Sequence, residues 1–164
     1  MYKFKPLKIA ALILILSFIE TGFFSEFPFL NVKIEFLLIL ALFLGFFAGK
    51  RQLYFYAFFC GMIKDMFSIV PFGVNIIAFL AAAFFAKTFS LKFFEVNKLV
   101  FAVFVFVSVL LTGCIAFFLS AQTFARDAFE SFLRIILING FVSALISPLL
   151  FSFFKLILIG DENK

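Results

Sequence analysis

Charged residues are scarce in this sequence, and histidine and tryptophan are missing altogether. Of the 164 residues, 14% are charged and 66% are hydrophobic. Soluble domains carry about 25% charged residues, so this chain lacks the polar surface of a water-soluble fold. The absence of histidine excludes imidazole acid–base chemistry and most zinc sites, because the two cysteines, Cys60 and Cys114, lie in separate apolar runs.

Motifs for catalysis and for phosphate binding are also missing. There is no Gly-x-Ser-x-Gly, no phosphate loop and no pair of carboxylates at helical spacing within an apolar run. We therefore expect a protein that is not an enzyme, with no catalytic residue, cofactor or metal. The net charge of +5 does not indicate nucleic-acid binding, because the basic residues are scattered at the ends of apolar runs and form no stripe.

Long apolar runs dominate what is present, and about 20 apolar residues suffice for a helix that crosses a bilayer core about 30 Å thick. The sequence predicts an all-α integral membrane protein with one domain, residues 1–164. The six transmembrane helices are expected at about residues 7–24, 32–48, 53–70, 74–86, 99–121 and 132–159. The last run exceeds the required length, so we expect it to tilt, to kink near Pro148, or to keep Arg134 at the interface.

Basic residues alternate between the two sides that six spans define. One side carries ten of them: Lys3, Lys5, Lys8, Lys50, Arg51, Lys87, Lys92, Lys98, Lys155 and Lys164. The other side carries four, each close to an acidic residue: Lys33, Lys64, Arg126 and Arg134. Because lysine and arginine concentrate in cytoplasmic loops, we expect both termini in the cytoplasm.

A Lys64-Asp65 pair lies inside the third apolar run, where charged side chains usually mark function. Gly61 shares a helix face with Asp65 and allows a neighbouring helix to approach. Adjacent Lys64 points about 100° away around the helix, so Asp65 needs a partner from another span. Our specific hypothesis is an ion pair with Arg134, and the alternative is that Lys64 and Asp65 are both solvated at the outer interface.

A turn, Pro71-Phe72-Gly73, follows this pair, because proline removes a backbone donor and glycine permits unusual dihedral angles. Asn75 then opens the fourth run, where it is expected to cap the helix or to bind the polar head of a ligand.

A polar stripe runs along the last apolar run, in which Asn139, Ser143 and Ser147 recur every four residues. Such residues usually join helices to one another, and lining a ligand site is the alternative. Lys33 and Glu35 are interpreted as snorkelling at the interface. The 33 phenylalanines are interpreted as biased residue usage on surfaces that face lipid.

The segment from Gly61 to Ser68, together with Pro71-Phe72-Gly73-Val74-Asn75, resembles the core motif of the MreD family of bacterial rod shape-determining membrane proteins. The chain length, the six-span plan and the basic turn Lys50-Arg51 agree with that resemblance. By the resemblance, the important positions are Gly61, Lys64, Asp65, Pro71, Phe72, Gly73 and Asn75.

The resemblance implies a multi-pass subunit of the cell-elongation complex in the bacterial cytoplasmic membrane. Its implied partners are an MreC-like single-span protein, the MreB filament system, a RodA-type glycosyltransferase, a penicillin-binding transpeptidase and the lipid bilayer. In this role the protein helps MreC and MreB to position and regulate peptidoglycan synthesis.

The MreD fold also resembles the substrate-binding subunits of energy-coupling-factor vitamin transporters. The alternative function is therefore a small-molecule binding subunit, with Asp65, Asn75 and Asn139 as ligand contacts. The Ala-x-x-x-Ala spacing that such subunits use toward their partners is absent from the first span, which favours the first reading.

Overall fold

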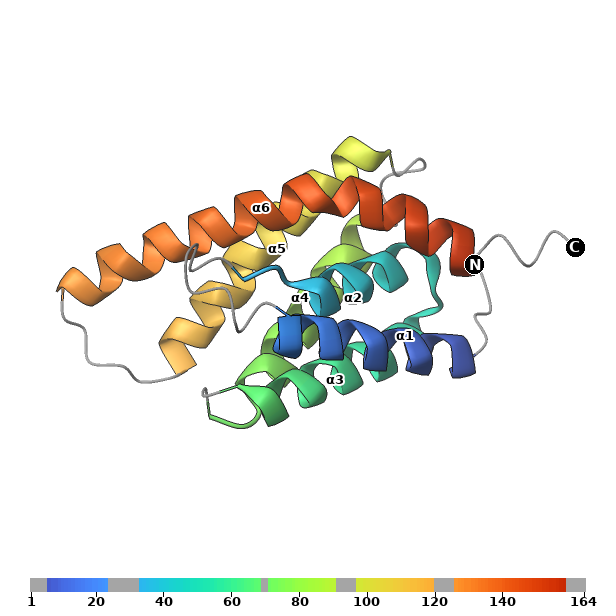
Figure 1. The fold of residues 1–164 in the computed structure, drawn as a ribbon, viewed down its shortest axis with the longest axis horizontal. Coiled ribbons are helices and arrows are strands. Elements are labelled where there is room, and N and C mark those ends of the chain that lie inside the picture. The colour runs from blue at the N-terminus through green and yellow to red at the C-terminus, as the bar shows by residue number, and fades with distance from the viewer. Residues whose placement is uncertain (1–5, 24–32, 69–70, 91–96, 120–125, 159–164) are drawn as a thin grey trace, which may run out of the picture.

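The computed structural model of the chain describes residues 6–23, 33–68, 71–90, 97–119 and 126–158. Six α-helices fill these ranges, in agreement with the predicted number, and they pack into one bundle (Figure 1). The helices are α1 (Pro6–Phe18), which continues into a π-helical turn η1 (Ile19–Phe23), α2 (Phe36–Phe47), α3 (Lys50–Phe67), α4 (Val74–Ser90), α5 (Lys98–Leu119) and α6 (Arg126–Leu158).

Three helix boundaries differ from prediction by four residues or more, and one of them is the end of α4, at Ser90 rather than near residue 86. Helix α2 begins at Phe36 rather than near residue 32, because the chain before it is held in a non-helical conformation by side chains of α6. Helix α6 begins at Arg126 rather than near residue 132, so the residues predicted as a polar link form its first turns. Arginine and glutamate are good helix formers, so a charged stretch does not by itself end a helix.

Helix α2 is the centre of the bundle, and it contacts each of the other five helices. Every residue from Phe36 to Gly45 is buried. A helix that is apolar on all sides is typical either of a lipid-facing span or of a protein core. Here it is enclosed by its neighbours, which explains why α2 has no polar face.

Several phenylalanines build this core, so the interpretation of this residue type as lipid-facing was wrong for them. Phe43 of α2 packs edge-to-face against Phe151 and Phe154 of α6, with ring centroids 5.6 and 5.5 Å apart. The ring centroid of Phe101 of α5 lies 5.0 Å from the ring centroid of Phe151. Edge-to-face aromatic pairs add about 0.5–1.5 kcal/mol beyond their burial, so this cluster stabilises the contact of α2, α5 and α6.

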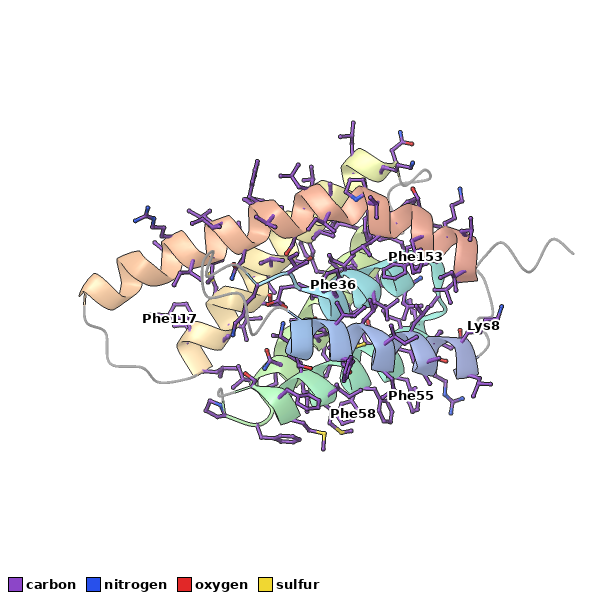
Figure 2. All side chains as sticks on the ribbon, viewed as in Figure 1. Lys8, Phe36, Phe55, Phe58, Phe117 and Phe153 are labelled. Atoms are coloured by element: carbon purple, nitrogen blue, oxygen red, sulfur yellow. The ribbon has the colours of Figure 1, made fainter. Side chains whose placement is uncertain are left out.

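Large apolar side chains cover the outside of the bundle, as Figure 2 shows for Phe55 and Phe58, which point away from it on α3. Leu14, Phe84 and Leu149 are each more than 60% exposed. Two helices, Lys98–Leu119 and Leu133–Leu158, are long and apolar enough to cross a membrane, and Phe36–Phe47 and Val74–Phe89 are shorter apolar helices. Since soluble monomers rarely expose such continuous apolar surface, a membrane location is the natural environment of this bundle.

Helix α6 continues through Pro148 without a break. Proline cannot donate to the carbonyl four residues earlier, which is that of Ala144. The hydroxyl of Ser147 donates to this same carbonyl at 2.8 Å. The serine thus supplies the hydrogen bond that the proline removes. This member of the predicted polar stripe therefore satisfies its own helix rather than a neighbouring one.

Helices α3 and α4 approach very closely at Gly61. A Cβ atom at this position would lie 2.6 Å from the Cα atom of Ile76 and 2.9 Å from the carbonyl oxygen of Asn75. Both obstacles are backbone atoms, so no side-chain rotation relieves them. The predicted close approach of a neighbouring helix at Gly61 is therefore present, and the neighbour is α4.

We expect Gly61→Ala to lower the free energy of unfolding in detergent by about 3 kcal/mol, because the two helix backbones must separate. Gly49→Ala is the matched control, since Gly49 has an ordinary φ of −67° and nothing within 4 Å of its added Cβ. Denaturant titration followed by circular dichroism measures both. Equal effects of the two substitutions would contradict this packing.

Candidate functional site

The carboxylate of Asp65 closes the N-terminus of helix α4. Asp65 is 5% exposed, and its Oδ2 accepts hydrogen bonds from the backbone N–H groups of Gly73 at 2.9 Å and Ile76 at 3.2 Å. Its Oδ1 accepts from both the backbone N–H and the side-chain amide of Asn75, at 3.0 and 2.8 Å. The first N–H groups of a helix lack partners within the helix and attract negative charge, so this carboxylate satisfies and stabilises them.

The turn between α3 and α4 brings these donors to the carboxylate. Gly73 adopts φ +102°, a conformation that L-residues with a side chain rarely accept, and this aims its N–H at Asp65. Pro71 and Phe72 are exposed at the tip of the turn. The glycine is therefore required by the cap, whereas Pro71 and Phe72 are free to contact another molecule.

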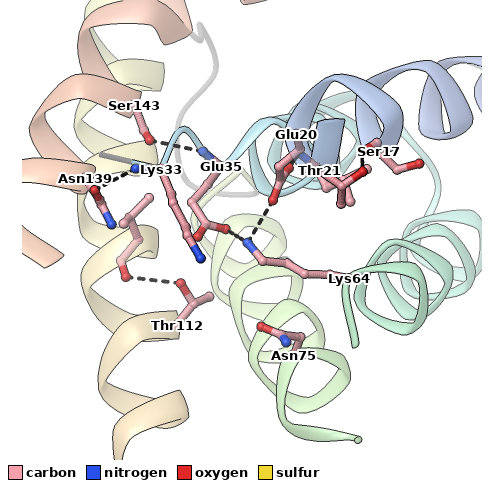
Figure 3. A network of polar contacts seen from close by, with 12 residues as sticks. Ser17, Glu20, Thr21, Lys33, Glu35, Lys64, Asn75, Thr112, Asn139 and Ser143 are labelled. Atoms are coloured by element: carbon pink, nitrogen blue, oxygen red, sulfur yellow. Dashed lines mark hydrogen bonds and ion pairs between the residues drawn. The ribbon is translucent and has the colours of Figure 1, made fainter. Parts of the chain in front are cut away.

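Lys64 occupies the neighbouring position and joins the first two helices. Its Nζ lies 3.1 Å from a carboxylate oxygen of Glu20, in η1, and forms a second ion pair with Glu35, directly before α2 (Figure 3). It also lies 5.6 Å from the ring centroid of Phe79. The side chains of the three charged residues are only 13–20% exposed, so the ion pairs are poorly screened by solvent.

The start of α2 is capped from two sides by other helices. Glu20 accepts the N–H of Leu37 at 3.0 Å. From α6, Asn139 accepts the N–H of Lys33 at 3.0 Å and Ser143 accepts the N–H of Glu35 at 3.3 Å, and Figure 3 shows both side chains pointing toward α2. In an apolar environment each backbone donor needs a protein partner, and these side chains provide it.

A cleft of about 160 Å³ lies beside this network, between the end of α1, the start of α2 and the end of α3. We call this region, with Glu20, Glu35, Lys64, Asp65 and Asn75, the Lys64 end of the bundle. The cleft combines apolar walls with the charged groups of Glu20, Glu35 and Lys64.

At the opposite end of α2, another lysine makes a comparable contact and is buried more deeply than Lys64. Lys87 of α4 is 5% exposed, and its Nζ donates to the carbonyl oxygen of Ala48 at 2.9 Å. This carbonyl belongs to the residue that ends α2, where the helix dipole favours a positive charge. Both ends of α2 are thus held by charged side chains from other helices.

The sequence matches the family described as rod shape-determining protein MreD over residues 3–157. The chain belongs to the MreD family. No curated protein and no solved structure matches it. Membership makes the chain a non-enzymatic membrane protein of cell-shape determination, in agreement with the prediction from its motif.

The MreD-like motif is brought together by the fold around one carboxylate. Gly61, Asp65, Gly73 and Asn75 all lie at the contact of α3 and α4, while Lys64 faces α1 and α2. Asn75 lies inside the first turn of α4 and donates to Asp65, so the prediction that Asn75 itself caps the helix was wrong. Its side chain instead strengthens the cap that Asp65 makes.

The predicted ion pair of Asp65 and Arg134 is absent from the described residues. All four contacts of the Asp65 carboxylate go to Gly73, Asn75 and Ile76, and Arg134 is exposed on α6. Backbone N–H groups, rather than a cation, compensate the charge. The alternative that Lys64 and Asp65 are simply solvated was also wrong, since both are engaged within the protein.

Sequence reasoning did not single out Glu20 and interpreted Glu35 as a snorkelling residue. The missed signal was a similarity between two helical hairpins, α1–α2 and α3–α4. Glu20 and Asp65 each lie near the end of an apolar run, and each is followed by a proline-containing segment and a second apolar run. In both hairpins the acidic residue of the first helix binds the N-terminus of the second.

We expect Asp65→Ala to lower the free energy of unfolding by about 3 kcal/mol, because it leaves buried N–H donors without an acceptor. Hydrogen exchange at the amides of Gly73, Asn75 and Ile76 should accelerate together. Asn75→Ala, which removes one hydrogen bond, should cost about 1 kcal/mol and add little to Asp65→Ala in the double variant. Fully additive effects would contradict the shared cap.

For the ion pairs we expect an order of effects. Lys64→Met should lower the free energy of unfolding by about 2 kcal/mol, because it leaves two partly buried carboxylates without their cation. Glu20→Ala should destabilise more than Glu35→Ala, since Glu20 also caps Leu37. Thermal unfolding in detergent ranks the three variants, and a larger effect of Glu35→Ala would contradict this assignment.

Proposed function

We propose that this chain is a six-span subunit of the cell-elongation complex in the bacterial cytoplasmic membrane. In this proposal it works beside an MreC-like protein and helps to connect MreB filaments in the cytoplasm with RodA-type glycosyltransferases and penicillin-binding transpeptidases outside. Membership of the MreD family supports the role in cell shape. Beyond this role, we propose the named partners and the regulation of peptidoglycan synthesis.

The distribution of charge supports an orientation with both termini in the cytoplasm. One end of the bundle carries four exposed basic residues, Lys50, Arg51, Lys98 and Lys155, and the other side carries two, Lys33 and Arg134. At the Lys64 end, the charges of Glu20, Glu35 and Lys64 pair with one another. Since exposed lysine and arginine favour the cytoplasmic side, the Lys64 end would face outward.

A scaffolding role is what the geometry of the Lys64 end supports best. Lys64 binds the first hairpin and Asp65 binds the start of α4, so two adjacent residues join four helices at one level. Their contacts hold polypeptide segments in place and leave no group poised for a reaction. The observation that carries the proposal is therefore this internally satisfied network at the MreD-like motif.

The alternative, a vitamin-binding subunit of an energy-coupling-factor transporter, has less support. Its proposed ligand contacts, Asp65, Asn75 and Asn139, are hydrogen-bonded within the protein. Ligand pockets commonly measure about 300–1,000 Å³, and the cleft at the Lys64 end is smaller, at about 160 Å³.

Depletion of the chain in a rod-shaped host that depends on it should turn rods into spheres, and expression of the intact chain should restore rods. Asp65→Ala should fail to restore them, whereas Gly49→Ala should succeed, because only the first substitution disturbs the network. Microscopy measures the ratio of cell length to width, with membrane abundance followed by immunoblot. Unchanged shape combined with a vitamin requirement would support the transporter instead.

A further inference from the structure

The cleft at the Lys64 end combines apolar walls with charge in a space that suits one side chain. Ile34, Leu37 and Ile63 are among its lining residues, together with the ion-paired carboxylates of Glu20 and Glu35. Its volume of about 160 Å³ is below the roughly 300–1,000 Å³ of pockets that enclose small-molecule ligands. A long side chain with an apolar stem and a charged head matches both the size and the walls.

The ion-paired charges beside the cleft do not balance. Glu20 and Glu35 carry two negative charges, and Lys64 between them carries one positive charge (Figure 3). The three side chains are only 13–20% exposed, so solvent screens the remaining negative charge poorly. The cleft therefore attracts one further positive charge.

Glu35 has the free acceptor that can bind this charge. Both carboxylate oxygens of Glu20 are occupied, one by Lys64 and the other by the N–H of Leu37. Glu35 uses Oε2 for Lys64, and its Oε1 has no hydrogen-bond or ion-pair partner in the part of the chain that the structure describes. Because an ionised carboxylate accepts hydrogen bonds at both oxygens, Oε1 is the atom that a second cation would contact.

Lys33 lines the same cleft but does not supply the missing charge. Its side chain is exposed and forms no ion pair with any described residue, although Glu35 is only two positions away. An exposed ammonium is strongly hydrated and gains little from an ion pair. Lys33 is therefore a weak competitor for a cation that another molecule brings into the cleft.

Two other sources of positive charge fit the cleft less well. The ammonium of an aminophospholipid headgroup is joined to a phosphate, so this headgroup brings no net charge. A second copy of this chain in the same membrane has the same orientation, and four of its exposed basic residues lie at the opposite end of the bundle, namely Lys50, Arg51, Lys98 and Lys155. A basic side chain of a different protein satisfies both the charge and the walls.

We propose that the cleft between η1, α2 and α3 binds a lysine or arginine side chain of a different protein. The charged head contacts Oε1 of Glu35, and the alkyl stem packs against Ile34 and Ile63. The ion pair with Lys64 holds Glu35 in place for this contact. This inference rests on the scaffolding role given under the proposed function, and it adds the contact site and the chemistry of the partner.

Photo-crosslinking in cells that carry this chain as their only copy tests the site. A photoreactive phenylalanine at Phe67, which lines the cleft, should form one crosslinked product with another protein. The same residue at Phe58, on the same helix but outside the cleft, should not.

Two substitutions then separate a cationic occupant from an anionic one. Glu35→Gln keeps the shape of the side chain and removes its charge, so it should reduce the product at least tenfold. Lys33→Gln should retain or increase the product, because it removes a competing cation. If Glu35→Gln fails to accumulate in the membrane, Ile63→Phe, which fills the cleft and leaves every charge in place, is read in the same way.

Mass spectrometry of the product locates the residue of the partner. Replacement of one lysine or arginine beside the crosslinked position by glutamine should abolish the product, which supports the proposal. It is overturned by crosslinking to lipid, to a second copy or within the same chain, by a product that survives Glu35→Gln, or by a product that Lys33→Gln abolishes. Loss of the product in Glu35→Gln while cells remain rods supports the cleft as a binding site and contradicts the proposed role in cell shape.

Discussion

The Asp65 carboxylate at the N-terminus of α4 is the interaction on which the rest of the structure depends. It accepts four hydrogen bonds across a turn that requires Gly73 at positive φ, and it fixes where α4 begins against α3. Only the missing Cβ at Gly61 lets the two backbones approach closely enough for this contact. In an apolar medium, helix termini are the most costly polar groups, so the residues that satisfy them determine how helices are placed.

The same physical solution occurs in the first hairpin, where Glu20 accepts the N–H of Leu37. Lys64 connects the two hairpins, because it forms ion pairs with Glu20 and Glu35. Its neighbour Asp65 accepts the backbone N–H groups at the start of α4. The charged residues of this network therefore have structural partners at the helix ends: Glu20, Glu35, Lys64 and Asp65. For a family of rod shape-determining proteins, this favours a rigid membrane scaffold whose function lies in the surfaces it presents to other proteins.

Composition and apolar periodicity were sufficient to predict an all-helical chain, the number of helices and the family motif, because long apolar runs and glycine–proline turns are local features. They could not predict that α2 is buried on every side, since lipid and protein both select leucine and phenylalanine. The partner of Asp65 was also misjudged. Sequence suggests cations for a buried carboxylate, yet the turn supplied backbone donors that carry no sequence signature.

By itself, the sequence determined the class of protein: too little charge for a soluble surface, no histidine for catalysis, and a Lys-Asp pair beside a Pro-Phe-Gly turn. Tertiary structure alone decided which groups meet, because Glu20, Glu35 and Lys64 come from three separate segments of the chain. Contacts of this kind depend on the relative height and rotation of the helices, and these are set by packing at residues such as Gly61 and Phe43 rather than by local residue preference.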